Sequence, residues 1–260
     1  MKICFLGSGA LGSAIGGALS EGGADVTLVD PWREHVDAMN RDGLTLSERG
    51  VDRRVRVRAA TGVDGIGPVD LVIVLVKSFH TREAVERARA IVGPDTAVVS
   101  LQNGLGHEEI IAEVRAREHG LAGKTYKGGG LLGPGHLVAG IKGKETIIGE
   151  LDGRVTERVT RIADAFNRAG LAVTVSTDIV GTMWDKLLIN VATGALAGIT
   201  RLPYGGLYAV PEVKACALAA VAEGMTVAAA GGGKVSYNDP EGPWTQAAEG
   251  LAAEFKTSLL

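Results

Sequence analysis

Cysteine, aromatic residues and metal-ligand motifs are all scarce in this chain. Two cysteines occur in 260 residues, and the aromatic content is 4%. So little cysteine excludes a disulfide scaffold, and with no secretory leader ahead of the first apolar run it predicts a reduced, cytoplasmic protein. The two cysteines and five histidines lack the spacing of a metal site, so we expect no metal.

An excess of charge of one sign is also absent. The 27 basic and 30 acidic residues give a formal net charge of −3, which argues against a nucleic-acid or membrane-surface partner. The one basic cluster, residues 49–58, alternates with valine and therefore predicts the solvated face of a strand. The longest apolar stretches, residues 69–76 and 215–222, are too short to span a bilayer. We expect no nucleic acid and no membrane as a partner.

The first thirty residues carry the most informative pattern. An apolar run at residues 3–6 leads directly into a glycine-rich turn, and a second apolar run, at residues 26–29, ends on Asp30. This order is typical of strand, turn, helix and strand, the first half of a dinucleotide-binding unit. The predicted cofactor-binding residues are those of the turn: Gly7, Ser8, Gly9, Ala10, Leu11 and Gly12.

Each glycine of the turn has its own expected task. Gly7 permits the sharp bend, Gly9 lets the backbone approach a pyrophosphate, and Gly12 lets the helix lie close to the sheet. The helix N-terminus would offer unpaired N–H groups to the phosphates. Asp30 follows at about the 20-residue spacing of a ribose-binding carboxylate. The alternative is a purely structural glycine turn, which the strand–turn–helix context disfavours.

The same strand–turn–helix order continues along the chain. Residues 69–76 form a nearly unbroken β-branched run, which is typical of a strand buried on both faces of a parallel sheet. The other predicted elements are strands at 97–101 and 172–175, helices at 81–92, 108–118 and 156–169, a hairpin of 44–46 with 55–57, and short antiparallel additions to the sheet at 128–130, 137–141 and 146–149. These elements predict a doubly wound α/β domain.

From residue 178 onward the pattern is helical. We predict a Rossmann-type dinucleotide-binding domain at residues 1–177 and an all-helical substrate and dimerisation domain at residues 178–260, with helices at 184–196, 210–230 and 244–260. Apolar helix faces would be buried against a second copy, so we expect a homodimer. The last helix halts at residue 260 without a cap, which indicates a shortened chain or a missing tail.

Polar side chains follow two predicted strands. Lys77 comes after one strand and Asn103 after the next. Because ligands bind outside the carboxyl ends of strands in a doubly wound sheet, both would share a crevice with the glycine turn. Lys186 and Asn190 are four residues apart on one face of an apolar helix, so both need a polar partner or a water-filled cleft. From spacing alone, Lys186 is equally well explained by a surface ion pair with a neighbouring aspartate.

Over essentially its whole length the sequence resembles the 2-dehydropantoate 2-reductases, or ketopantoate reductases. The matching segments are Gly7-Ser8-Gly9-Ala10-Leu11-Gly12, Val76-Lys77-Ser78, Leu101-Gln102-Asn103-Gly104, Gly149-Glu150, Trp184-Asp185-Lys186-Leu187 with Asn190, and Thr257-Ser258-Leu259-Leu260. The resemblance implies NAD(P)H-dependent reduction of the C2 ketone of 2-dehydropantoate, a branched 2-oxo acid, to pantoate on the route to pantothenate and coenzyme A.

The resemblance also implies a role for each matching polar residue. Lys186 would donate a proton to the ketone oxygen as alkoxide charge develops there. Asn190 would hydrogen-bond the substrate hydroxyl, and Ser258 would contact its carboxylate. Asn103 and Lys77 would bridge the nicotinamide ribose and the substrate. No metal is required, since the lysine supplies the electrophilic charge.

Departures from the family pattern leave the substrate and the cofactor open. Gly194 stands where another asparagine often follows, and Tyr204 where a polar residue is usual. Two explanations are open. The pocket admits a bulkier 2-oxo acid, or another side chain or a water molecule replaces the missing polar groups. Asp30, in place of the usual basic residue, favours NADH because a carboxylate repels a 2′-phosphate, whereas Arg33 nearby favours NADPH. The family's Thr-Glu-Ile-Asp-like segment after Ser258 is not present.

Two alternatives to ketopantoate reduction stay open. One is a reductase or dehydrogenase of the same fold that acts on a different 2-oxo or hydroxy acid. The other is a nucleotide-binding sensor without turnover. The intact set of Lys77, Asn103 and Lys186 disfavours the sensor, because a pure binder does not need an ammonium group facing the nicotinamide.

Overall fold

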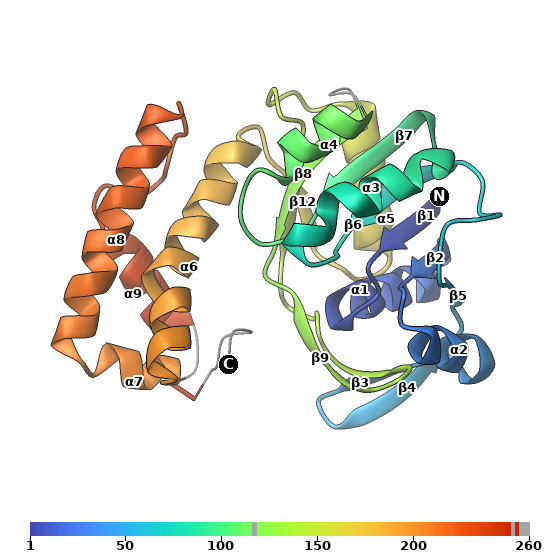
Figure 1. Ribbon diagram of the computed structural model, residues 1–260, viewed down its shortest axis with the longest axis horizontal. Helices are drawn as coiled ribbons and strands as arrows, with labels where there is room; N and C mark the ends of the chain where they lie inside the picture. The colour runs from blue at the N-terminus through green and yellow to red at the C-terminus, as the bar shows by residue number, and fades with distance from the viewer. Residues whose placement is uncertain (116–118, 251–252, 255–260) are drawn as a thin grey trace. The chain divides into compact units, whose positions relative to one another are not determined.

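The computed structural model describes residues 1–115, 119–250 and 253–254, and its chain divides into two compact units, Met1–Ile179 and Val180–Leu260 (Figure 1). The boundary expected from the sequence, after residue 177, lies two residues before this division. Each unit has its own core of buried apolar side chains.

Unit 1 is built on an eight-stranded sheet with the order β12-β11-β8-β7-β6-β1-β2-β5. Its strands are β1 (Lys2–Leu6), β2 (Asp25–Val29), β5 (Arg58–Ala60), β6 (Val69–Val74), β7 (Val92–Ser100), β8 (Gly120–Thr125), β11 (Thr146–Gly149) and β12 (Val173–Val175). Neighbouring strands are parallel except β8 and β11. Along β6, Leu71 and Ile73 enter one core cluster and Val72 and Val74 the other, as expected for a strand buried on both faces.

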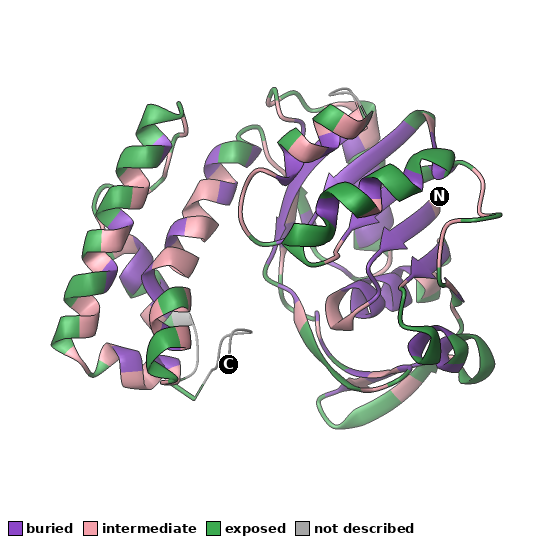
Figure 2. Cartoon of the chain, viewed as in Figure 1, coloured by how far each residue is buried: buried purple, intermediate pink, exposed green. Residues whose placement is uncertain are grey.

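Helices cover both faces of this sheet. They are α1 (Ala10–Glu21), α2 (Arg33–Asp42), α3 (Thr81–Arg87), α4 (His107–Arg115) and α5 (Glu157–Arg168), with short 3₁₀ segments η1 (Ser78–His80) and η2 (Ala88–Ile91). Apolar side chains of α1 and α5 pack into one core cluster, and those of α3 and α4 into the other. Figure 2 shows the strands buried between helices whose outer faces are exposed. The predicted doubly wound α/β fold is confirmed.

A second, four-stranded sheet has the order β4-β3-β10-β9. Its strands are β3 (Leu44–Glu48), β4 (Val51–Val55), β9 (Gly128–Gly133) and β10 (His136–Gly140). The predicted hairpin of β3 and β4 is present, but the expectation that residues 128–130 and 137–141 extend the main sheet is wrong. Leu44, Leu46 and Leu137 give this small sheet an apolar face, which packs in the same core cluster as α1.

Two further differences concern the main sheet. The helix predicted to continue to residue 92 ends at Arg87, and β7 already begins at Val92. Pro94 is tolerated in this strand because it falls where the register with β6 shifts, so its missing N–H breaks no regular ladder. Strand β8 was not predicted, since glycines and Lys124 interrupt its apolar pattern although all six residues are buried.

Unit 2 contains α6 (Ile179–Thr200), which begins at the boundary, α7 (Tyr204–Tyr208), α8 (Pro211–Ala230) and α9 (Glu241–Gly250). Its core includes Leu188, Leu207, Val221 and Trp244. Part of the gap between the helices predicted at 184–196 and 210–230 instead forms α7, and most of the helix predicted beyond α9 lies outside the described residues. By length and composition alone α8 is apolar enough to cross a membrane, and one such helix among the described residues is weak evidence for a membrane span.

Candidate cofactor and substrate site

The glycine turn between β1 and α1 is closely packed on one side and open on the other. Gly7 has φ +97°, and a Cβ atom there would lie 2.6 Å from the Val76 backbone nitrogen. A Cβ at Gly12 would lie 2.1 Å from the Gly7 carbonyl oxygen. A Cβ at Gly9, in contrast, meets no described atom within 4 Å. The turn therefore requires glycine at positions 7 and 12 and leaves space above Gly9.

The N-terminus of α1 opens into this space. Ser13 is the first residue of the helix to bond back, with its N–H donating to the Gly9 carbonyl oxygen at 2.9 Å. The N–H groups of Ala10, Leu11 and Gly12 precede that bond and have no partner within the helix. Such a helix end carries a partial positive charge, which suits the pyrophosphate of a dinucleotide.

Asp30 connects the glycine turn, through hydrogen bonds, to the segment that follows β2. One carboxylate oxygen accepts a hydrogen bond from the Ser8 backbone N–H at 2.9 Å, and the other accepts from the Trp32 N–H at 3.0 Å. Each oxygen keeps a second lone pair, so the carboxylate is held in place and can still accept from a ribose hydroxyl. Arg33 is exposed at the first position of α2.

A cavity of about 330 Å³ lies at the carboxyl ends of β1, β2 and β6, beside Gly7. Its walls are mainly apolar, with Val29, Pro31, Val63 and Val76 among the lining residues. The chain order reverses between β1 and β6, and this is the position where open α/β sheets bind ligands. The apolar walls suit the flat ring of a nucleotide base.

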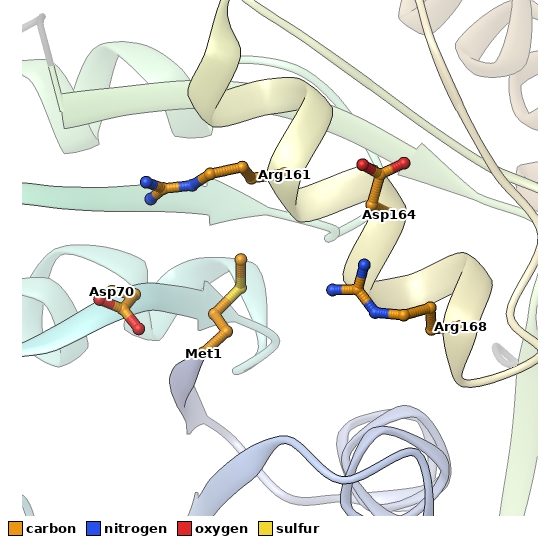
Figure 3. Close-up of a pocket in the computed structure, with 5 residues that line it drawn as sticks. All are labelled: Met1, Asp70, Arg161, Asp164 and Arg168. Carbon is orange, nitrogen blue, oxygen red and sulfur yellow. The ribbon is translucent and has the colours of Figure 1, made fainter.

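A second cavity, also of about 330 Å³, lies near the amino end of β1 (Figure 3). Figure 3 shows the lining residues: Arg161, Asp164 and Arg168 along α5, and Met1 and Asp70 on the other side of the cavity. Because this cavity lies at the amino end of β1, it is at the wrong end of the strands for the cofactor.

The structure brings Lys77 and Asn103 to the ends of neighbouring strands, β6 and β7, where both are exposed. The buried side chain of Gln102 joins the two strand ends. Its amide nitrogen donates to the Val76 carbonyl oxygen at 2.7 Å and to Thr81 Oγ1 at 2.9 Å. No role for Gln102 was expected from the sequence, although its position beside Asn103 was a signal.

Glu150, which lies in one of the segments that resemble the family, has a structural role in unit 1. Its carboxylate accepts hydrogen bonds from Arg158 Nε at 2.8 Å and from Thr156 Oγ1 at 2.5 Å, at the start of α5. Burial alone would raise the pKa of Glu150, but the hydrogen bonds from Arg158 and Thr156 outweigh burial and lower this pKa below its usual value.

Lys186 and Asn190 belong to unit 2, where both are half-buried on α6. The neighbouring Asp185 accepts a hydrogen bond from the Ser236 N–H at 2.8 Å. The predicted contact residue Ser258 lies outside the described residues.

In the described part of the chain, no three His, Cys, Asp or Glu side chains form a metal-binding group.

The two departures from the family pattern lie in different environments. Gly194 is half-buried on α6. Tyr204 is buried in the core of unit 2, where its hydroxyl is hydrogen-bonded to Thr193 Oγ1 at 3.0 Å. Its ring also packs edge-on against Tyr208, with centroids 6.1 Å apart. Tyr204 thus contributes to helix packing in this unit.

Both parts of the chain match families of known proteins. The family described as Ketopantoate reductase PanE/ApbA matches residues 3–153, and its companion, Ketopantoate reductase PanE/ApbA C terminal, matches residues 178–260. The 2-dehydropantoate 2-reductase of Pyrococcus horikoshii is 37% identical over 242 residues, which are 93% of this chain and 78% of that protein. The enzyme of the same name from Halobacterium salinarum is 35% identical over 237 residues, 91% of this chain and 78% of that protein.

Solved structures show the same architecture. A PanE/ApbA family ketopantoate reductase from Ralstonia eutropha JMP134 matches with a TM-score of 0.89 and 31% identity, over 99% of this chain and 83% of that one. A ternary structure of D-mandelate dehydrogenase with NADH and anilino(oxo)acetate matches with a TM-score of 0.90 and 25% identity, over 100% of this chain and 84% of that one.

Proposed function

This chain belongs to the ketopantoate reductase family, and we propose that it reduces the C2 ketone of 2-dehydropantoate to pantoate with a reduced nicotinamide dinucleotide. The observation that carries the proposal is the glycine turn, which adjoins an apolar cavity and has an open face and helix N–H groups without a partner within the helix. Two relatives are both named 2-dehydropantoate 2-reductase, and their similarity covers 93% and 91% of this chain, which includes parts of both units.

Lys186 is the proposed general acid. When bound, the nicotinamide supplies a hydride to C2 of the ketone. The C=O π bond breaks, and its electron pair moves to the oxygen. The Lys186 ammonium gives that oxygen a proton, so the product is an alcohol, and the neutral amine recovers a proton from water. The positive charge of a lysine ammonium also stabilises the developing alkoxide.

The other predicted residues have positioning or binding roles in this proposal. Asn190, one helical turn after Lys186, would hydrogen-bond the substrate hydroxyl. Lys77 and Asn103, at the adjacent ends of β6 and β7, would contact the nicotinamide ribose and the substrate. Ser258 would bind the substrate carboxylate.

The deciding experiment separates turnover from cofactor binding. We expect Lys186→Ala to lower kcat by about 100-fold or more, the usual contribution of a general acid, while the Kd for NADH or NADPH stays unchanged. Lys214→Ala is the matched control, because Lys214 lies in the same unit and pairs with Glu241 on the surface. Unchanged turnover in Lys186→Ala refutes the general acid, and a wild-type chain that binds cofactor without turning over any 2-oxo acid is a sensor.

We also propose a preference for NADH. Asp30 is held beside the glycine turn by the N–H groups of Ser8 and Trp32, and its charge repels a 2′-phosphate. Arg33 is the nearby cation that would favour NADPH. The test is kcat/KM with each cofactor, and a tenfold advantage for NADPH contradicts the proposal.

A second candidate is reduction of a bulkier 2-oxo acid. Gly194 removes a side chain from the helix that carries Lys186, and the D-mandelate dehydrogenase structure holds anilino(oxo)acetate with NADH in the same fold. A panel of 2-oxo acids of increasing size distinguishes the candidates. Highest kcat/KM for 2-dehydropantoate supports the first, and highest kcat/KM for an aromatic 2-oxo acid supports the second.

The proposed assembly is a homodimer formed through the helical unit. Ile199 on α6 and Val227 on α8 are 81% and 56% exposed, so apolar surface is available for a second copy. Sedimentation equilibrium tests this, and a monomeric mass at micromolar concentration contradicts it.

A further inference from the structure

His35, on α2, is completely buried beneath the glycine turn. Its Nε2 atom lies 2.9 Å from the Ser8 carbonyl oxygen and 3.2 Å from Ser13 Oγ. Its Nδ1 atom accepts a hydrogen bond from the Gly135 N–H at 2.9 Å. One imidazole thus joins the turn after β1, the first helix and the hairpin between β9 and β10.

These contacts determine which ring nitrogen carries the proton. Because the Gly135 N–H donates to Nδ1, that nitrogen has a lone pair and no hydrogen. In the neutral ring the hydrogen is then on Nε2, from which it is donated to the Ser8 carbonyl oxygen. Trp32 stacks on the imidazole, with ring centroids 5.2 Å apart and planes 9° from parallel, and shields it.

The Ser8 carbonyl and the Gly9 N–H belong to the same peptide group. A trans peptide is planar, so its C=O and N–H point in opposite directions. His35 and Ser13, whose Oγ donates to the same carbonyl oxygen at 2.6 Å, hold the C=O toward the interior. The Gly9 N–H must therefore point the opposite way, outward, and a Cβ built on the same residue would meet no described atom within 4 Å.

We propose that His35 is a positioning residue that turns the Gly9 N–H toward the pyrophosphate of the cofactor. This inference rests on the proposed nicotinamide cofactor and adds a residue that itself contacts neither cofactor nor substrate. Ser8 itself is also held in place, because its N–H donates a hydrogen bond to Asp30 and its hydroxyl donates one to the Val29 carbonyl oxygen. The imidazole completes the set of bonds that fixes this peptide.

Two amide variants test the two ends of the ring separately. A glutamine amide nitrogen can occupy the place of Nε2 and donate to Ser8, whereas an asparagine amide oxygen occupies the place of Nδ1 and serves only Gly135. Both substitutions lose the stacking with Trp32. We expect His35→Asn to raise the Kd of NADH about tenfold, as for one lost hydrogen bond, and His35→Gln to restore most of that affinity. At saturating NADH, kcat with the 2-oxo acid should change less than twofold in both.

Controls distinguish positioning from general damage. His136→Asn alters a histidine of the second sheet that contacts Ser47 rather than the turn, and its Kd should equal that of the wild type. Ser13→Ala removes the other donor to the Ser8 carbonyl and should weaken NADH binding in the same direction, which keeps the test valid if a His35 variant does not fold.

The outcomes separate the two proposals. Equal Kd values for His35→Asn and His35→Gln, with melting temperatures that match each other, would refute the positioning role. So would an unchanged Kd in Ser13→Ala together with unchanged Kd in folded His35→Asn. A wild-type chain that binds neither NADH nor NADPH would refute the cofactor itself, and with it both proposals.

Discussion

The side-chain amide of Gln102 donates a hydrogen bond to the backbone carbonyl oxygen of Val76, across a distance of 2.7 Å. Val76 immediately precedes Lys77, and Gln102 immediately precedes Asn103. The bond therefore fixes the spacing between two strand ends that carry proposed active-site side chains. Gln102 is buried, so loss of its amide leaves the Val76 carbonyl oxygen without this partner.

Gln102→Leu should lower both stability and turnover. The Val76 carbonyl and Thr81 hydroxyl would lose a buried partner, at a cost of about 1–3 kcal/mol in the free energy of unfolding. We expect kcat to fall more than cofactor affinity, because Lys77 and Asn103 would lose their fixed spacing. Urea unfolding and steady-state kinetics measure the two effects. Gln246→Leu, at an exposed position of α9, is the control, and kinetics of Gln102→Leu equal to wild type would contradict the role.

Lys127 should make stability depend on pH in the alkaline range. Its buried ammonium donates to the carbonyl oxygens of Lys144 and Ala172, at 2.6 and 2.9 Å, and to Thr146 Oγ1 at 3.1 Å. Burial lowers the pKa of Lys127 to about 8, and the nearby charge of Glu145 opposes that shift only in part.

The sign of the effect follows from proton binding. Between pH 8 and about 10.4, the unfolded chain keeps a proton on Lys127 that the folded chain has lost, so the free energy of unfolding rises with pH. Relative to Lys127→Met, the wild type should gain about 1–3 kcal/mol over this window. Urea unfolding of both proteins at several pH values measures it, and a constant difference would show that the lysine does not titrate there.

Glu150 should contribute to stability at neutral pH and lose that contribution in acid. Hydrogen bonds from Arg158 and Thr156 keep its pKa below the usual value although burial alone would raise it. A carboxyl with a lowered folded pKa stabilises the fold above its unfolded pKa of about 4.3, and this contribution disappears as pH falls through the folded pKa. The stability difference between wild type and Glu150→Gln should be largest above pH 6 and shrink below pH 4. A stability difference that grows as the pH falls would contradict a lowered pKa for Glu150 in the folded protein.

The two cysteines should differ sharply in reactivity. Burial raises the pKa of the Cys4 thiol to about 12, whereas Cys216 is exposed on α8. At pH 8 a thiol-specific disulfide reagent should modify one thiol in the native protein and two in denaturant. Cys216→Ser should leave no rapidly reacting thiol in the native state. Rapid modification of both in the wild type would indicate that β1 opens easily.

Local sequence was sufficient for the elements whose conformation depends on neighbouring residues. The strand of residues 2–6, the glycine turn and α1 follow from an apolar run and from glycines at Gly7 and Gly12, where a side chain would collide with backbone. The hairpin of β3 and β4 and the helix beginning after Thr156 follow from similar local signals. The resemblance to the ketopantoate reductases, which rests on motifs quoted from the sequence, is confirmed by the family match.

Tertiary structure alone decided where distant segments meet. Pairing of β10 with β3 joins residues 136–138 to 45–47, and no local pattern distinguishes that sheet from the main one. His35, Gln102 and Lys127 acquire roles only from partners up to 100 residues away. The physical reason is that a residue's periodicity and backbone preference are properties of its neighbours in sequence, whereas the hydrogen-bond partners of a buried polar group are set by packing.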